Sequence, residues 1–129
     1  MQKDFLETPI LFIIFNRPDT IKKVFGKIKE VKPKKLYLVQ DGARNENEKE
    51  LLQKARNIIK IDWDCEVFTD YLDKNIGPKK RISSGISWFF EKEERGIILE
   101  EDCLPEKSFF YFCEEMLEKY KDDERAGMI

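Results

Sequence analysis

Ile10-Leu11-Phe12-Ile13-Ile14-Phe15 is the stretch that decides the fold. An apolar run without polar alternation is typical of a strand buried on both faces, as in the centre of a parallel sheet. The run stops at Asn16-Arg17-Pro18, and apolar residues then recur at helical spacing, at Ile21, Val24, Phe25, Ile28 and Val31. A strand, a turn and a helix therefore form the first unit of the chain.

The same unit repeats after residue 35. Leu36-Tyr37-Leu38-Val39 is a second short strand, and Gln40-Asp41-Gly42 follows it. Asn45 and Glu48 then form a pattern typical of a helix cap. The helix that they begin is predicted to bury Leu51, Leu52, Ala55, Ile58 and Ile59.

Two further units complete the pattern. Glu66-Val67-Phe68 is the weakest strand, and a loop leads from it to a helix with Ile82, Ile86, Phe89 and Phe90 on one side. Ile97-Ile98-Leu99 is the fourth strand, and the helix after it is predicted to bury Phe109, Phe112, Cys113, Met116, Leu117 and Tyr120. Strands that alternate with helices imply right-handed crossovers. The sequence thus predicts an α/β fold, with a Rossmann-like, mostly parallel sheet and helices on both faces.

Length and composition indicate one domain over residues 1–129. Charged residues make up 39% of the chain and the net charge is −2, a balance that favours neither nucleic acid nor an acidic membrane surface as a partner. No apolar run approaches the roughly 20 residues of a membrane span, and Met1-Gln2-Lys3-Asp4 does not begin a signal peptide. We therefore expect no transmembrane segment and a cytoplasmic location.

The spacing of the cysteines and the absence of histidine limit the kinds of catalysis that this chain could perform. Cys65, Cys103 and Cys113 have no Cys-x-x-Cys spacing, which argues against a disulfide framework and against a zinc site. The chain contains no histidine, so Ser-His-Asp triads, Cys-His pairs and His-ligated metals are excluded. Catalysis by this chain would depend on carboxylates, cations or a metal ion.

Three adjacent acids end the fourth predicted strand. Glu100, Glu101 and Asp102 follow the buried run directly, so they would emerge together at the edge of the sheet. Carboxylate oxygens are hard ligands that suit Mg²⁺ or Mn²⁺. The alternative interpretation is a solvated acidic loop that caps the next helix.

The other unusual polar residues also follow strands. Asn16 and Arg17 come after the first strand, Asp41 after the second, and Asn75 and Gly77 lie in the loop after the third. Because ligands bind at the carboxyl ends of parallel strands, we expect these residues to share one site. Taken singly, each has a structural alternative: Asn16 could start a helix, and Asp41-Gly42 is a common turn dipeptide.

The order of these motifs resembles the nucleotide-binding half of a GT-A type glycosyltransferase, over nearly the whole chain. The resemblance is carried by Asn16-Arg17-Pro18, Gln40-Asp41-Gly42 and Leu99-Glu100-Glu101-Asp102, in the family's order and with similar spacing. The acid triplet is similar to the Glu-Asp-Asp form of the Asp-x-Asp motif of Golgi-type N-acetylglucosaminyltransferases, with Glu101 in place of the central aspartate. Those enzymes also have a proline and a Phe-Phe pair downstream, where this chain has Pro105, Phe109 and Phe110.

The resemblance implies a role for each of these residues. Asp102 would bind Mn²⁺ or Mg²⁺, with Glu100 and Glu101 facing the ribose and the donor sugar. Asp41 would accept a hydrogen bond from the base, beside Asn16 and Arg17. The candidates for contact with the diphosphate are the basic residues after the third strand, beside Asn75 and Gly77; they are Lys79, Lys80 and Arg81.

The resemblance also implies the partners: a nucleotide-sugar donor, with a UDP-sugar favoured, and a glycan-type acceptor, as in polysaccharide biosynthesis. The family's catalytic base comes from the segment after the acidic motif. We therefore expect a truncated domain that binds nucleotide weakly and transfers little sugar, and no catalytic residue is assigned.

There are three alternatives to the interpretation as a glycosyltransferase. One is a non-catalytic interaction domain with a degenerate GT-A fold. Another is a response-regulator receiver, although receivers have an acid pair after the first strand, where this chain has Asn16-Arg17, and a phosphorylated aspartate after the third, where it has Thr69-Asp70. Sugar-phosphate nucleotidyltransferases rank lowest, because the chain lacks their glycine-rich loop after Phe15.

Overall fold

The computed structural model of this protein describes residues 5–102 and 107–119. The described residues form, in chain order, β1 (Ile10–Ile14), α1 (Pro18–Val31), β2 (Lys35–Gln40), α2 (Glu46–Ile58), β3 (Glu66–Tyr71), α3 (Pro78–Lys92), β4 (Ile97–Glu100) and α4 (Lys107–Lys119). The strands pair in parallel in the order β3-β2-β1-β4. The predicted α/β fold with a Rossmann-like sheet is confirmed.

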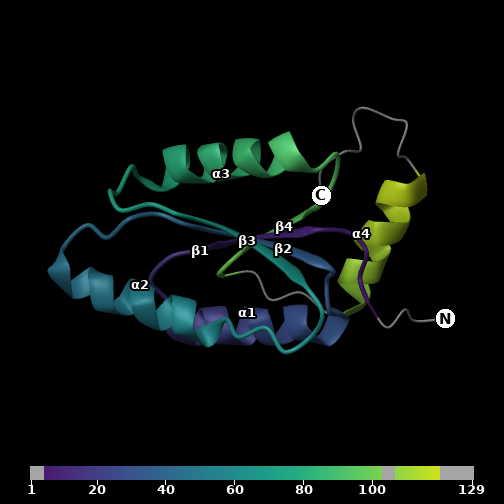
Figure 1. Ribbon diagram of the computed structural model, residues 1–129, viewed down its shortest axis with the longest axis horizontal. Helices are drawn as coiled ribbons and strands as arrows, with labels where there is room; N and C mark the ends of the chain where they lie inside the picture. The colour runs from purple at the N-terminus through teal and green to yellow at the C-terminus, as the bar shows by residue number, and fades with distance from the viewer. Residues whose placement is uncertain (1–4, 103–106, 120–129) are drawn as a thin grey trace.

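Helices cover both faces of the sheet, as the sequence predicted (Figure 1). In that view α3 lies above the sheet, whereas α1 and α2 lie below it. The first two helices carry the chain outward from β1 to β2 and then to β3, and α3 returns it to β4 on the other side of β1. The strand order therefore changes direction at β1. The carboxyl ends of β1 and β4 flank this switch point.

The strand order also tests the receiver alternative. In receivers β1 lies between β2 and β3. Here β2 lies between β1 and β3, and Ile10 of β1 pairs with Leu36 of β2 on one side and with Ile97 of β4 on the other. This order is not that of a receiver and argues against that alternative.

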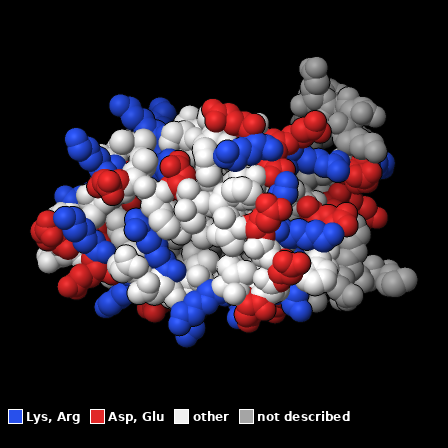
Figure 2. Space-filling model, in the orientation of Figure 1, with Lys and Arg blue, Asp and Glu red and all other residues white. Residues whose placement is uncertain are grey.

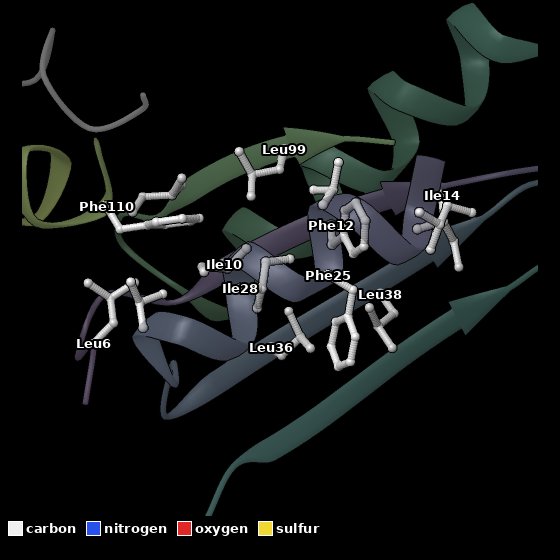
Figure 3. Packing of buried hydrophobic residues seen from close by; sticks show 14 of the residues in the cluster. Leu6, Ile10, Phe12, Ile14, Phe25, Ile28, Leu36, Leu38, Leu99 and Phe110 are labelled. Carbon is white, nitrogen blue, oxygen red and sulfur yellow. The ribbon is translucent and has the colours of Figure 1, made fainter. Parts of the chain in front are cut away.

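The larger part of the core lies between the sheet and α1. All five residues predicted at helical spacing in α1 are buried. They pack against the even-numbered residues of β1 and against Leu36 and Leu38 of β2. Figure 3 shows side chains of this cluster meeting from several elements: Ile10, Phe12, Ile14, Phe25, Ile28, Leu36, Leu38, Leu99 and Phe110.

A second cluster fills the space beneath α3. Leu11 and Ile13, the odd-numbered residues of β1, pack there with Tyr37, Val39 and Phe89. The helix lies close to the sheet, since a Cβ atom on Gly85 would be 2.9 Å from Cγ1 of Val39. Because both faces of β1 are buried, the strand needs an apolar residue at every position, which explains its unbroken apolar sequence.

The structure corrects several local predictions. Leu51 and Phe112 were predicted to be buried, but they are 39% and 59% exposed, because Phe110 and Leu52, the latter correctly predicted to be buried, occupy the core positions. β3 extends to Tyr71, beyond the predicted Phe68, because its pairing with β2 continues to Gln40. The remaining predictions, on Cys103, Pro105 and Tyr120, lie outside the described residues.

A buried carboxylate fixes α4 to the segment before β1. Oε2 of Glu114 accepts hydrogen bonds from the main-chain nitrogens of Glu7, at 2.8 Å, and Thr8, at 2.9 Å, and from Oγ1 of Thr8, at 3.1 Å. Only 8% of Glu114 is exposed. α4 is therefore attached at the amino end of β1, and the carboxyl ends of the strands are left for the candidate site.

Candidate functional site

A pocket of about 280 Å³ lies at the carboxyl ends of the strands, at the switch point between β1 and β4. It contains seven of the ten residues that the sequence assigned to a binding site: Arg17, Asp41, Asn75, Arg81, Glu100, Glu101 and Asp102. Asn16, Gly77 and Lys80 are not part of its lining. The apolar part of the lining consists of Ile13, Ile14, Phe15, Pro78 and Ile82.

The pocket combines charges of both signs. Arginine side chains come from three different loops or helices, at Arg17, Arg44 and Arg81, and acids come from Asp41 and residues 100–102. On the face of the molecule in Figure 2, basic and acidic side chains are likewise interspersed. The pocket thus offers a negative edge at the end of β4 and positive groups around it.

The three adjacent acids do not share one environment. Oε2 of Glu101 accepts a hydrogen bond from the main-chain nitrogen of Phe15, at 2.8 Å, and the main chain of Arg17 also donates to this carboxylate. Burial raises the pKa of Glu101, and the two main-chain donors act in the opposite direction. Glu100 is half-buried and Asp102 is exposed. Glu101 therefore joins the ends of β4 and β1, whereas Asp102 projects freely.

No ready-made cluster for a metal ion exists among residues 5–102 and 107–119: no three cysteine, aspartate or glutamate side chains converge there. Glu101 is engaged with the main chain of the β1 loop. The carboxylates of the triplet that remain are those of Glu100 and Asp102, and both line the pocket.

Asp41 connects two loops at the rim. It is 5% exposed, and its Oδ1 accepts hydrogen bonds from the main-chain nitrogens of Gly42, at 2.9 Å, and Ile76, at 3.0 Å, while its Oδ2 accepts one from Gly77, at 3.0 Å. Asn75 strengthens the connection, since its Nδ2 donates to the carbonyl of Gly42 at 2.8 Å. A carboxylate has about four acceptor positions, so Asp41 keeps about one for a ligand.

The beginning of α3 faces the pocket with basic character. Gly77 precedes the helix with φ at 93°, a left-handed conformation that favours glycine, and no side chain caps the helix. Its first turn contains no acid. Among the three basic residues there, Arg81 lines the pocket, while Lys79 and Lys80 are exposed outside it.

Arg81 is almost completely buried, with 3% of its surface exposed. Its Nη2 is paired with the carboxylate of Asp70 at 3.1 Å and also donates to the carbonyl of Asp70, and its Nη1 donates to Oγ of Ser84 at 3.0 Å. Its Nε is buried and has no hydrogen-bond partner among the described residues. A buried donor without a partner is rare in folded proteins.

Two pocket residues were not found by sequence reasoning, Phe15 and Arg44. Phe15 was predicted only as part of the first strand, and no role was predicted for Arg44. In the structure the guanidinium of Arg44 lies over the ring of Phe15, 5.6 Å from its centroid. The signal that could have found Arg44 is Glu48, four residues later, at a spacing that allows an ion pair at the start of the helix.

Glu48 holds Arg44 and Asn16 together. Its Oε2 accepts hydrogen bonds from Nη2 of Arg44, at 2.6 Å, and from Nδ2 of Asn16, at 3.1 Å. Its own main-chain nitrogen donates to Oδ1 of Asn45, at 3.0 Å, which confirms the predicted helix cap. The hydrogen bond from Arg44 is the main cause that lowers the pKa of Glu48 from 4.5 to about 2. Asn16 therefore contacts Glu48, the partner of the pocket residue Arg44, and does not line the pocket itself.

The sequence of this chain matches no protein-family model and no curated protein. In the described part of the chain, no helix has the length and apolar character needed to cross a membrane. The candidate site is thus defined by its own geometry and chemistry.

Proposed function

We propose that this chain binds a nucleotide-diphospho-sugar donor in the pocket at the switch point, as the nucleotide-binding part of a GT-A type glycosyltransferase. The observation that carries the proposal is the convergence of residues from the ends of all four strands on one pocket of about 280 Å³. The resemblance implies a binding role for seven of the thirteen residues that line this pocket. In open α/β sheets, the switch point is where ligands bind.

The positive groups suit a diphosphate. The amino end of α3 carries exposed N–H groups and a partial positive charge, and its first turn contains no acid that would compete with an anion. Arg81 lies in this turn, and Arg17 directly precedes α1, which lies on the other face of the sheet (Figure 1). Oxygen atoms of a diphosphate would find donors on both sides.

The remaining carboxylates fit a divalent cation that is shared with the ligand. Mg²⁺ is usually held by one or two carboxylates together with phosphate oxygens and water, and Asp102 and Glu100 offer two. Such an ion, Mg²⁺ or Mn²⁺, neutralises charge on a diphosphate leaving group when it is bound. Asp102 is the primary candidate because it is exposed and free of the hydrogen bonds that engage Glu101. Glu101 is a positioning residue in this proposal.

The acceptor in this proposal is a glycan, and no residue of the chain is assigned as a catalytic base. The proposal therefore concerns donor binding. Asp41 and Asn75 would hold the two loops together at the rim of the pocket, and Arg17 would lie beside the ribose and the diphosphate.

Thermal unfolding with UDP, GDP, CMP and UDP-sugars, each with and without Mn²⁺, tests the proposal. A ligand at about 100 times its dissociation constant adds roughly 2.7 kcal/mol to the free energy of unfolding. We expect a shift that requires both a nucleotide and the metal and that is lost in Asp102→Asn. Asp62→Asn is the matched control, because Asp62 is exposed and ion-paired with Lys29 outside the pocket.

The outcomes separate the candidates. No shift with any nucleotide would contradict donor binding. A shift that is independent of the metal and unchanged in Asp102→Asn would favour a non-catalytic domain with a degenerate GT-A fold, an alternative supported by the engagement of Glu101 with the main chain of the β1 loop.

A further inference from the structure

We propose that Arg44, held in place by Glu48, is the residue on which the nucleobase of the ligand stacks, and that Phe15 supports it from behind. This inference rests on the proposed function, because it concerns the nucleotide in the same pocket. It assigns the base to the part of the pocket lined by Phe15 and Arg44, and not to the basic beginning of α3.

The position of Arg44 is fixed by several contacts. Its main-chain nitrogen and its Nε donate to Oε1 of Glu48 at 2.8 and 3.0 Å, and its Nη2 donates to Oε2 at 2.6 Å. Glu48 is 5% exposed, so this acceptor is itself held by the fold. A two-pronged contact of this kind fixes the plane of the guanidinium as well as its position.

The guanidinium of Arg44 lies against an aromatic ring, and the side chain is still largely exposed. The ring of Phe15 covers one side, with the guanidinium carbon 5.6 Å from the ring centroid. The side chain of Arg44 is nevertheless 61% exposed, and both Arg44 and Phe15 line the pocket. Guanidinium planes and aromatic rings are the surfaces on which bases stack in proteins.

The charge of Arg44 is already balanced. The low pKa of Glu48, about 2, keeps its carboxylate ionised near neutral pH, so Arg44 and Glu48 form a neutral pair. A paired arginine attracts a phosphate less than a free one does, but its planar surface is unchanged. Arg44 therefore suits the base, whereas Arg17 and the beginning of α3 suit the phosphates.

Asp41 is less able to recognise the base. The resemblance gave it this role, but main-chain N–H groups of Gly42, Ile76 and Gly77 occupy most of its acceptor positions. Recognition of the base through stacking requires no free acceptor. Arg44 is therefore a better candidate than Asp41 for contact with the base.

Isothermal titration of the full 129-residue chain with UDP and with ribose 5-diphosphate, both with Mn²⁺, tests this inference. The two probes share the ribose and the phosphates and differ in the base. We expect Arg44→Ala to weaken UDP binding about tenfold or more and to leave ribose 5-diphosphate binding unchanged. Arg44→Lys keeps the charge but lacks the plane, so we expect the same loss.

Lys49→Ala is the matched control, since Lys49, like Arg44, is an exposed residue in an ion pair, with Glu46 at 3.0 Å, but it belongs to α2 and lies outside the pocket. Thermal unfolding of each variant without ligand checks that the fold is retained. Full UDP affinity in Arg44→Lys, or an equal loss for both probes, would overturn the inference while leaving donor binding intact. If the unchanged chain binds neither probe, the proposed function fails and this inference fails with it.

Discussion

Oε2 of Glu101 lies 2.8 Å from the main-chain nitrogen of Phe15, which joins the end of β4 to the end of β1 across the switch point of the sheet. The neighbouring Asp102 is exposed and makes no such contact with the β1 loop. Two adjacent carboxylates at one strand end thus have different environments. One stabilises the rim of the pocket, and the other is free to meet a ligand.

This difference predicts that two adjacent substitutions change the free energy of unfolding by unequal amounts. Glu101→Ala should lower the free energy of unfolding by about 1 to 3 kcal/mol, because it leaves main-chain N–H groups without their acceptor. Asp102→Ala should change it by less than about 0.5 kcal/mol, as is usual for an exposed site. Urea unfolding of the two variants measures both values. Equal losses would contradict the division of roles.

A pair of glycines tests how closely the two loops approach. A Cβ atom on Gly42 would lie 2.5 Å from the main-chain carbon of Lys74, so Gly42→Ala must displace the loop that carries Asn75. We expect a loss of about 1 to 3 kcal/mol in the free energy of unfolding. In Gly26→Ala the new atom meets nothing within 4 Å. That helical substitution should stabilise the protein by about 0.5 to 1 kcal/mol. Thermal unfolding of both variants would show the contrast, and a neutral Gly42→Ala would contradict it.

The elements with regular apolar patterns could be predicted from the sequence. The unbroken run of β1 indicated burial on both faces, and the spacing in α1 identified every residue that it buries. The carboxyl ends of the strands could be predicted to meet, because that follows from parallel pairing. These features depend on the period of the sequence and on general rules of α/β topology.

The contacts inside the site could not be predicted, because they join distant parts of the chain. Glu101 and Phe15 are 86 positions apart, and Asp41 and Ile76 are 35 positions apart. Arg81 was predicted only as a candidate for contact with a diphosphate, and its ion pair with Asp70 of β3, which compensates its burial, joins two different elements. Such pairs have no local signal. A charged residue becomes a buried one only when the fold brings its partner to it.

Glu48 predicts a specific dependence of stability on pH. Its pKa is about 2 in the folded protein, below the ordinary value of 4.5, mainly because of the hydrogen bond from Arg44. The contribution of its ionised form is therefore fully present above pH 4.5 and is lost as the pH falls toward 2. We expect the unchanged chain to be more stable than Glu48→Gln at pH 7, and this difference to shrink between pH 4.5 and 2.

Urea unfolding at several pH values measures this difference. Glu46→Gln is the control, because Glu46 is in the same helical turn and is exposed. A difference between the unchanged chain and Glu48→Gln that stays constant down to pH 2 would contradict the prediction.

Glu114 predicts that one buried carboxylate contributes to the attachment of α4 to the segment before β1. Its Oε2 receives hydrogen bonds from Glu7 and Thr8, the residues just before β1, and 8% of the residue is exposed. Glu114→Ala should lower the free energy of unfolding by about 1 to 3 kcal/mol, since buried donors lose their acceptor. It should also increase hydrogen exchange at the main-chain N–H of Thr8.

Glu115→Ala, at an exposed position of the same helix, should change neither the free energy of unfolding nor the exchange at Thr8. Unchanged exchange at Thr8 in Glu114→Ala would show that other contacts hold α4 in place. Because α4 lies at the amino end of β1, we expect nucleotide binding to be unaffected by Glu114→Ala, which separates stability of the fold from occupancy of the pocket.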